Sequence, residues 1–172
     1  MYKNLDPAVG IIPYHLELAM QVYQAVGMVV TKQPVRELES KEYGSCRFEL
    51  DRKAIVFRVT KITPIKVGEF VTIWKRSNEI ILPLDSSDPV DFVVINTNDE
   101  QHNGQFIFNK ETLIKRGIMS NCGKKGKMAI RVYPPWTNPT VKQAIKTQQW
   151  QLNHFFSFDS LGEENRIIRF FS

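Results

Sequence analysis

Lysine and arginine side chains, which can bind an anion, are gathered into two blocks of this sequence. Residues 51–77 contain 7 basic and 2 acidic residues, and residues 106–151 contain 9 basic and 1 acidic residue. The segment between them, residues 78–105, contains 6 acidic residues and 0 basic ones. Although the net charge is only +5, segregation of this kind is typical of a face that binds a polyanion.

The two blocks contain the cations from which we expect a nucleic-acid interface. Such an interface needs positive charges that follow phosphates, together with flat side chains that can lie against sugars or bases. Trp136 and Trp150 stand among polar residues of the second block, where either core packing or ligand contact would explain them. The predicted binding residues are Arg58, Lys61, Lys66, Arg76, Lys124, Lys125, Lys127, Arg131, Trp136, Lys142, Lys146 and Trp150.

Arg58 has an alternative explanation. It projects from a predicted strand on the face opposite Phe57, so that it should point into the second covered face of a sheet. A cation in that position needs either a bound anion or a paired carboxylate. The sequence leaves both possibilities open, with Asp88 or Asp91 as the candidate partner.

The sequence lacks the residue patterns of metal sites and of phosphate-binding loops. His15, His102 and His154 are isolated, so the sequence predicts no metal site and no cofactor. The segment 123–127, Gly-Lys-Lys-Gly-Lys, lacks the first glycine and the hydroxyl residue of a phosphate-binding loop. We expect instead a flexible basic loop, at a hairpin tip or between a helix and a strand.

Length and cysteine usage predict a single domain of a cytoplasmic protein. With 172 residues the chain can bury a core without disulfides. Cys46 and Cys122 have no partner at ligand or disulfide spacing, a pattern typical of a reducing compartment. The longest uncharged run, residues 18–31, is 14 residues long and too short for a membrane span.

The periodicity of apolar residues predicts strands and helices in a mixed order. Alternation over 46–50 and 55–59, around a turn at 51–53, is typical of a hairpin. The segment 91–95 is almost entirely apolar, as expected of a strand covered on both faces. Further strands are expected near 70–74, 105–108 and 129–133.

Helix signals are found at both ends of the chain and near its middle. Residues 31–44 have no such signal and are predicted to be a connection with a short helical turn at most. One or two helices are predicted between Asp6-Pro7 and Gly27. A short helix is predicted from Asn109 to Gly117, and the last one starts at Asn138-Pro139. For the last helix we expect Val141, Ala144, Ile145, Gln148 and Leu152 to face inward and Lys142, Lys146 and Gln149 to face solvent. These elements predict an α+β fold: a mixed central sheet flanked by helices, in one domain over 1–172.

A set of residues spread in order along the chain matches the pattern of a known family: Arg58, Lys61, Thr63-Pro64-Ile65-Lys66, Gly68, Phe70, Trp74-Lys75-Arg76, Pro83, Asp88, Asp91, Gly104-Gln105-Phe106-Ile107-Phe108, Lys110, Gly117-Ile118, Arg131-Val132-Tyr133-Pro134, Trp136, Lys146-Thr147-Gln148 and Trp150-Gln151. With these residues the chain resembles the MepB-like proteins of bacteria. The resemblance covers about residues 43–156 and leaves 157–172 as a C-terminal extension. It departs from the family pattern at Asn109, where a proline is usual.

The resemblance implies a sheet similar to nuclease-like folds, with nucleic-acid binding as the proposed activity. It also implies a gene that, in some species, lies beside a multidrug efflux pump and its repressor. One alternative is therefore a metal-dependent nuclease of the PD-(D/E)XK type, with Asp88 and Asp91 as candidate metal ligands. On the next strand, however, Gln105 and Ile107 occupy the positions of the second acid and the lysine. Another alternative is a small-molecule or protein-interaction module linked to drug efflux.

Overall fold

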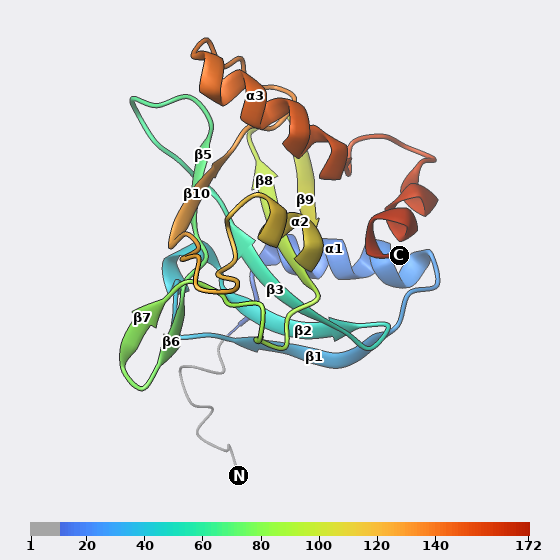
Figure 1. Cartoon of the computed structure of the whole chain (residues 1–172). Coiled ribbons are helices and arrows are strands. Elements are labelled where there is room, and N and C mark those ends of the chain that lie inside the picture. Colours follow the sequence, from blue (N-terminus) through green and yellow to red (C-terminus); the bar gives the residue numbers. More distant parts are fainter. Residues whose placement is uncertain (1–10) are drawn as a thin grey trace.

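The computed structural model describes residues 11–172 and has a six-stranded sheet at its centre (Figure 1). The predicted helix start at Asp6-Pro7 lies outside the described residues. The strands are β1 (Val30–Arg36), β2 (Cys46–Leu50), β3 (Lys53–Val59), β4 (Lys61–Ile62), β5 (Glu69–Thr72), β6 (Lys75–Ser77), β7 (Ile80–Leu82), β8 (Phe92–Asn98), β9 (Asn103–Asn109), β10 (Ala129–Val132) and β11 (Phe155–Ser157). The helices are α1 (Tyr14–Ala25), α2 (Lys110–Lys115) and α3 (Lys142–Gln151), with 3-10 helices η2 (Lys41–Tyr43), η3 (Leu152–His154) and η4 (Glu164–Phe171).

The central sheet is mixed, as predicted. Its strand order is β1-β2-β3-β8-β9-β11, in which β3 and β8 are parallel and the other neighbours are antiparallel. Parallel neighbours need a crossover connection, and the connection from β3 to β8 contains β4 to β7. Two of these strands join β10 in a small sheet of order β10-β5-β4, and the other two form the ribbon β6-β7. The chain is thus an α+β domain.

The predicted hairpin over β2 and β3 is confirmed. The two strands pair antiparallel with Cys46 opposite Phe57. Asp51 and Arg52 in the turn have φ angles of 48° and 64°, as the tight turns that match strand twist require. The side chain of Asp51 also accepts a hydrogen bond of 2.8 Å from the backbone N–H of Val29.

Residues 31–44 contain a strand, which corrects the prediction of a connection. The strand β1 forms the edge of the central sheet and pairs with β2 through an irregular register. Most of its side chains are exposed, so the apolar alternation that indicates a strand is absent from its sequence. Pro34 is compatible with this position because an edge strand does not need every N–H. The short helical turn expected in this segment is η2.

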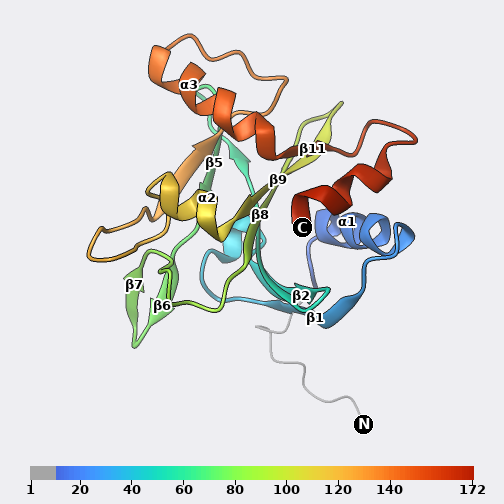
Figure 2. The same cartoon turned by 45° about the vertical axis from the view of Figure 1, so that its right-hand side comes forward.

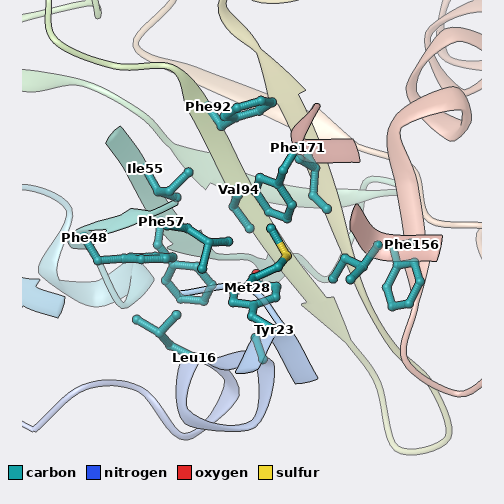
Figure 3. Close-up of a cluster of buried hydrophobic side chains, with 14 of the residues drawn as sticks. Leu16, Tyr23, Met28, Phe48, Ile55, Phe57, Phe92, Val94, Phe156 and Phe171 are labelled. Atoms are coloured by element: carbon teal, nitrogen blue, oxygen red, sulfur yellow. The ribbon is translucent and has the colours of Figure 1, made fainter. Parts of the chain in front are cut away.

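Two buried apolar clusters lie on opposite faces of the central sheet. On one face the side chains of β2, β3, β8 and β9 pack against α1 and η4. Figure 3 labels Leu16, Tyr23, Met28, Phe48, Ile55, Phe57, Phe92, Val94, Phe156 and Phe171 of this cluster. Because Ile167 and Phe171 are 0% and 3% exposed, the C-terminal extension is an integral part of this core.

The other face of the sheet is covered by β5, β10 and α2, with α3 above them (Figure 2). Val56, Val93 and Ile95 point to this side, whereas Phe57 and Val94 point to the first cluster. Every residue of β8 except its last is buried. The prediction of a strand covered on both faces is therefore confirmed.

The helices are short, and α2 has the predicted caps. The side chain of Asn109 accepts a hydrogen bond of 2.8 Å from the N–H of Thr112, and Gly117 has a φ of 67° after the last turn. Within residues 11–172, no helix is long and apolar enough to cross a membrane.

The helix α3 is present, but it starts at Lys142 and not at Asn138-Pro139, and only part of its predicted inward face is buried. Ala144 and Gln148 are half-buried, as predicted, whereas Leu152 is exposed. Val141 and Ile145 are 66% and 37% exposed, whereas Gln151 is buried. The side chain of Gln151 accepts a hydrogen bond from the N–H of Tyr133 and donates one to the carbonyl of Arg131, both at 2.9 Å. Hydrogen bonds to the backbone around β10 therefore hold this helix in place. An apolar stripe cannot reveal such a contact.

Candidate nucleic-acid interface

A cavity of about 530 Å³ lies between α2, β10 and α3 and is lined by four cations. Lys115 and Arg116 come from the C-terminal end of α2, Lys127 from the following loop, and Arg131 from β10. None of the described residues that line the cavity is acidic. We call it the cationic pocket; its other lining residues are Ile118, Ala129, Ile130, Tyr133, Gln143, Ala144, Thr147, Trp150 and Gln151.

Local structure explains why these four cations meet. The C-terminal end of a helix favours positive charge, and this end of α2 carries Lys115 and Arg116. The chain then turns at Gly117 and returns through the basic loop to β10, whose Arg131 is opposite Phe70 of β5. Of the two places that the sequence left open for residues 123–127, a hairpin tip or a helix-to-strand connection, the structure has the second.

Trp150 and Arg116 form one wall of the cationic pocket. The guanidinium of Arg116 lies over the indole ring of Trp150, 4.7 Å from its centroid. The same indole is half-buried and packs against Phe108 at a centroid distance of 5.5 Å. Burial and the charge of Arg116 lower the pKa of the neighbouring His154. Trp150 therefore serves partly as core and partly as a platform for an exposed arginine.

Among the predicted residues, Lys127, Arg131 and Trp150 lie together in the cationic pocket. Lys115 and Arg116 are the members that we did not predict. They were recognisable as helical cations near Gly117, but only the folded chain places the end of α2 beside Lys127 and Arg131.

The other lysines of the second block that we predicted to bind are exposed on different surfaces. Lys124 and Lys125 line a separate hollow of about 390 Å³, which Lys75 and Asp85 also line. Lys142 and Lys146 lie on the outer face of α3, as predicted, and do not line the cationic pocket.

Arg58 is buried and paired, which removes it from the accessible candidates. Its side chain is 1% exposed, and its Nη2 lies 3.2 Å from the Oε2 of Glu37. Further hydrogen bonds run to the carbonyls of Phe57 and Thr72, at 2.9 and 3.2 Å. Burial lowers the pKa of Arg58, and the carboxylate of Glu37 opposes that shift.

The paired-carboxylate explanation of Arg58 is therefore the one that holds, but its predicted partners were wrong. Glu37 fills that place instead of Asp88 or Asp91 and also pairs with Arg47 of β2. It was overlooked because it lies in the segment that we assigned to a connection. The pairing joins the segment after β1 to the interior of the sheet.

The remaining cations of the first block lie outside the cationic pocket. Lys61 is 3.3 Å from Glu42, and its ammonium group lies over the ring of Tyr43. Arg76, on the ribbon β6-β7, is 3.8 Å from Glu39. Lys66 is exposed on the loop before β5.

Trp136 lies at a third, mostly uncharged hollow of about 290 Å³. Its indole stacks on the ring of His102 at a centroid distance of 4.9 Å. Lys66, Glu69 and Asp99 also line this hollow. Burial raises the pKa of Glu69 to about 7. Because carboxylates repel phosphate, this hollow is a weaker candidate for a nucleic-acid backbone than the cationic pocket.

The carboxylates considered for a nuclease site have structural partners. Asp88 lies 2.6 Å from the ammonium group of Lys75 and accepts a hydrogen bond from the N–H of Asp85. Asp91 accepts one of 2.8 Å from the N–H of Ala54, which ties the start of β8 to β3. Within residues 11–172, no three His, Cys, Asp or Glu side chains are grouped so that they could hold a metal ion.

The residues at the positions of the second acid and the lysine, Gln105 and Ile107, are both buried on the side of the first core cluster. Ile107 is 1% exposed there. Gln105 is fully buried and belongs to a chain of polar contacts. Its Oε1 accepts from the hydroxyl of Tyr23 at 2.5 Å, and its Nε2 donates to Asn96 at 3.4 Å. Asn96 in turn donates to Asn103 at 3.1 Å.

The fold and the site define an α+β domain with a mixed sheet and a cationic pocket on the face covered by α2, β10 and α3. The MepB-like family model matches residues 37–157, about the span that the sequence resemblance predicted. The crystal structure of MepB has a TM-score of 0.74 to this chain and 30% sequence identity, and the match covers 86% of this chain and 99% of that one. This chain therefore belongs to the MepB-like family. No protein with a curated description matches it.

Proposed function

We propose that this chain binds DNA or RNA through the phosphate backbone, with little sequence preference, and that the cationic pocket is the centre of the interface. The lining of the pocket carries the proposal: four cations with no acidic residue among the described ones. Four like charges repel one another across a confined space, so a bound anion would stabilise them. The backbone of a nucleic acid provides such anions, because its phosphates follow one another along the strand.

The exposed lysines near the pocket favour an extended, multiply charged ligand over a single small anion. Lys124 and Lys125 are exposed on the loop that leads to Lys127, and Lys142 and Lys146 are exposed on α3. A nucleic-acid backbone that occupies the pocket could reach these side chains as well. This arrangement offers contacts to phosphate, whereas base-reading needs side chains that are positioned in a groove.

We propose further that the scaffold is nuclease-like in arrangement but serves binding. Support comes from the positions that a PD-(D/E)XK enzyme would use for catalysis. Gln105 and Ile107 are buried in the core, and Asp91 is engaged by backbone. An amide and an aliphatic side chain cannot replace a second metal-binding carboxylate and a catalytic lysine.

We expect duplexes of equal length and unrelated sequence to bind with similar affinity, because phosphate contacts carry no sequence information. Fluorescence anisotropy with several scrambled duplexes, at one fixed salt concentration, measures this. The same measurement is made with single-stranded DNA and RNA of the same sequences. Discrimination of about tenfold or more between the scrambled duplexes would contradict the proposal. Failure of every nucleic acid to bind would leave the small-molecule or protein-interaction alternative.

We expect purified protein to leave bound nucleic acid intact in Mg²⁺ or Mn²⁺, because Gln105 and Ile107 occupy positions that the cleavage reaction requires. Denaturing gels of end-labelled substrate, incubated with each metal and with EDTA, measure this. Since Asp91 also supports the fold, its variant must be shown to melt like the parent protein. Metal-dependent cleavage that a folded Asp91→Asn variant lacks would favour the nuclease alternative.

A further inference from the structure

The size of the cationic pocket limits what can enter it. Its volume of about 530 Å³ is in the range of sites for small organic ligands, roughly 300–1,000 Å³. A duplex presents phosphates on its outside while its bases are stacked and paired, so it can contact the rim but cannot place a nucleotide inside. An unpaired nucleotide has both a phosphate and a free base to place in such a hollow.

Arg116 provides a surface on which a base can stack. Its guanidinium lies over the indole of Trp150 at 4.7 Å, and Phe108 packs against that indole in turn. Trp150 therefore holds the guanidinium against a wall that belongs to the core. Arg116 itself is exposed, so the guanidinium face turned away from Trp150 remains open. Arginine planes, like aromatic rings, are used to stack unpaired bases.

The other cations surround this platform. Lys115 precedes Arg116 on α2, while Lys127 and Arg131 line the same cavity from the loop and from β10. Arg131 is held in place by a hydrogen bond of 3.4 Å to the carbonyl of Gly68 and by the ring of Phe70 beneath it. The arrangement is complementary to one nucleotide. The cationic side chains of Lys115, Lys127 and Arg131 can bind its phosphate, and the flat guanidinium of Arg116 can stack on its base.

We propose that the cationic pocket seats one unpaired nucleotide of a single strand, with the base stacked on Arg116 and the phosphate held by Lys115, Lys127 and Arg131. This inference rests on the proposed function and adds a preference for unpaired over paired nucleic acid. The remaining cations contact the strand on either side of the seated nucleotide. The exposed Gln143 on α3 lies at the pocket, where its amide can meet the edge of the base.

The test compares an unstructured single strand with a blunt hairpin duplex of equal nucleotide number, for the parent protein and for Arg116→Lys. Lysine keeps the charge but has no plane, so the loss of one stacked base should weaken single-strand binding by about fivefold or more. Duplex affinity and the dependence of binding on salt should change little. Arg169→Lys is the matched control, because Arg169 is an exposed arginine of η4 on the opposite side of the sheet.

Three results would overturn the inference. In the first, the parent protein binds the duplex as tightly as the single strand. In the second, Arg116→Lys lowers both affinities equally, which would assign Arg116 a charge role alone. In both cases the proposed function stands. In the third, no nucleic acid binds at all, and the proposed function fails together with the inference. Melting curves of both variants exclude loss of folding as a cause.

Discussion

Replacing Lys115, Arg116 and Lys127 together by alanine should weaken duplex binding and make it much less sensitive to salt. Each phosphate contact that is lost reduces the slope of log affinity against log salt by about 0.9, so three contacts reduce it by roughly 2.7. From about 50 to 200 mM salt the variant should therefore lose about fortyfold less affinity than the parent protein. Arg131 is left intact because it also contacts Gly68 and Phe70.

The control for this variant removes the same charge elsewhere. Lys32 of β1 and Arg166 and Arg169 of η4 are exposed and do not line the pocket. Alanine at these three positions should leave the salt slope within about 0.5 of the parent value, because distant surface charges add only a screened field. Equal slopes for the two triple variants would show that net charge, and not the pocket, drives binding.

Glu37→Ala should lower the free energy of unfolding by about 3–5 kcal/mol, because it leaves the buried guanidinium of Arg58 without its carboxylate. Urea unfolding followed by circular dichroism measures this change. Glu49→Ala is the comparison: Glu49 pairs with Lys32, whose side chain is 72% exposed, and its loss should cost less than about 1 kcal/mol. A Glu37 variant as stable as the Glu49 variant would contradict the assigned ion pair.

Adding Arg58→Ala gives a double-mutant cycle. Removing Arg58 and Glu37 together should cost less than the sum of the single losses, because the second removal no longer leaves a buried charge alone. Hydrogen bonds from Arg58 to Phe57 and Thr72 are lost in both backgrounds and cancel in the coupling energy. Coupling near zero would mean that Arg58 is held by these carbonyls and not by Glu37.

Those parts of the fold that depend on local patterns could be predicted from sequence. Alternation gives the hairpin β2-β3, an unbroken apolar run gives β8, and Asn109 and Gly117 bound α2. The edge strand β1 was missed because its side chains face solvent and contain no apolar period. The inward face of α3 was predicted only in part. Gln148 lies inward as predicted and donates to backbone carbonyls. Gln151 was missed because a glutamine that bonds to the backbone gives no apolar signal.

The candidate site was predictable only in part for a related reason. Charge segregation identifies the two cationic blocks, but it does not separate a buried cation such as Arg58 from an exposed one such as Lys127. The partner of Arg58 is 21 positions away in the sequence, in a segment without a clear pattern. Likewise, only the tertiary packing of α2 against β10 and α3 creates a cavity from residues that are spread over the second block.

The polar contacts that connect Tyr23, Gln105, Asn96 and Asn103 have a consequence for the specificity of folding. Asn96 and Gln105 are direct neighbours across β8 and β9. A slip of one residue in β9 would turn Gln105 to the other face of the sheet, so that its amide would lose both the hydroxyl of Tyr23 and the side chain of Asn96. Both faces of these strands are apolar enough to accept either orientation of their other residues. The buried amides therefore fix the register of β8 and β9, because only one alignment of the two strands satisfies their hydrogen bonds.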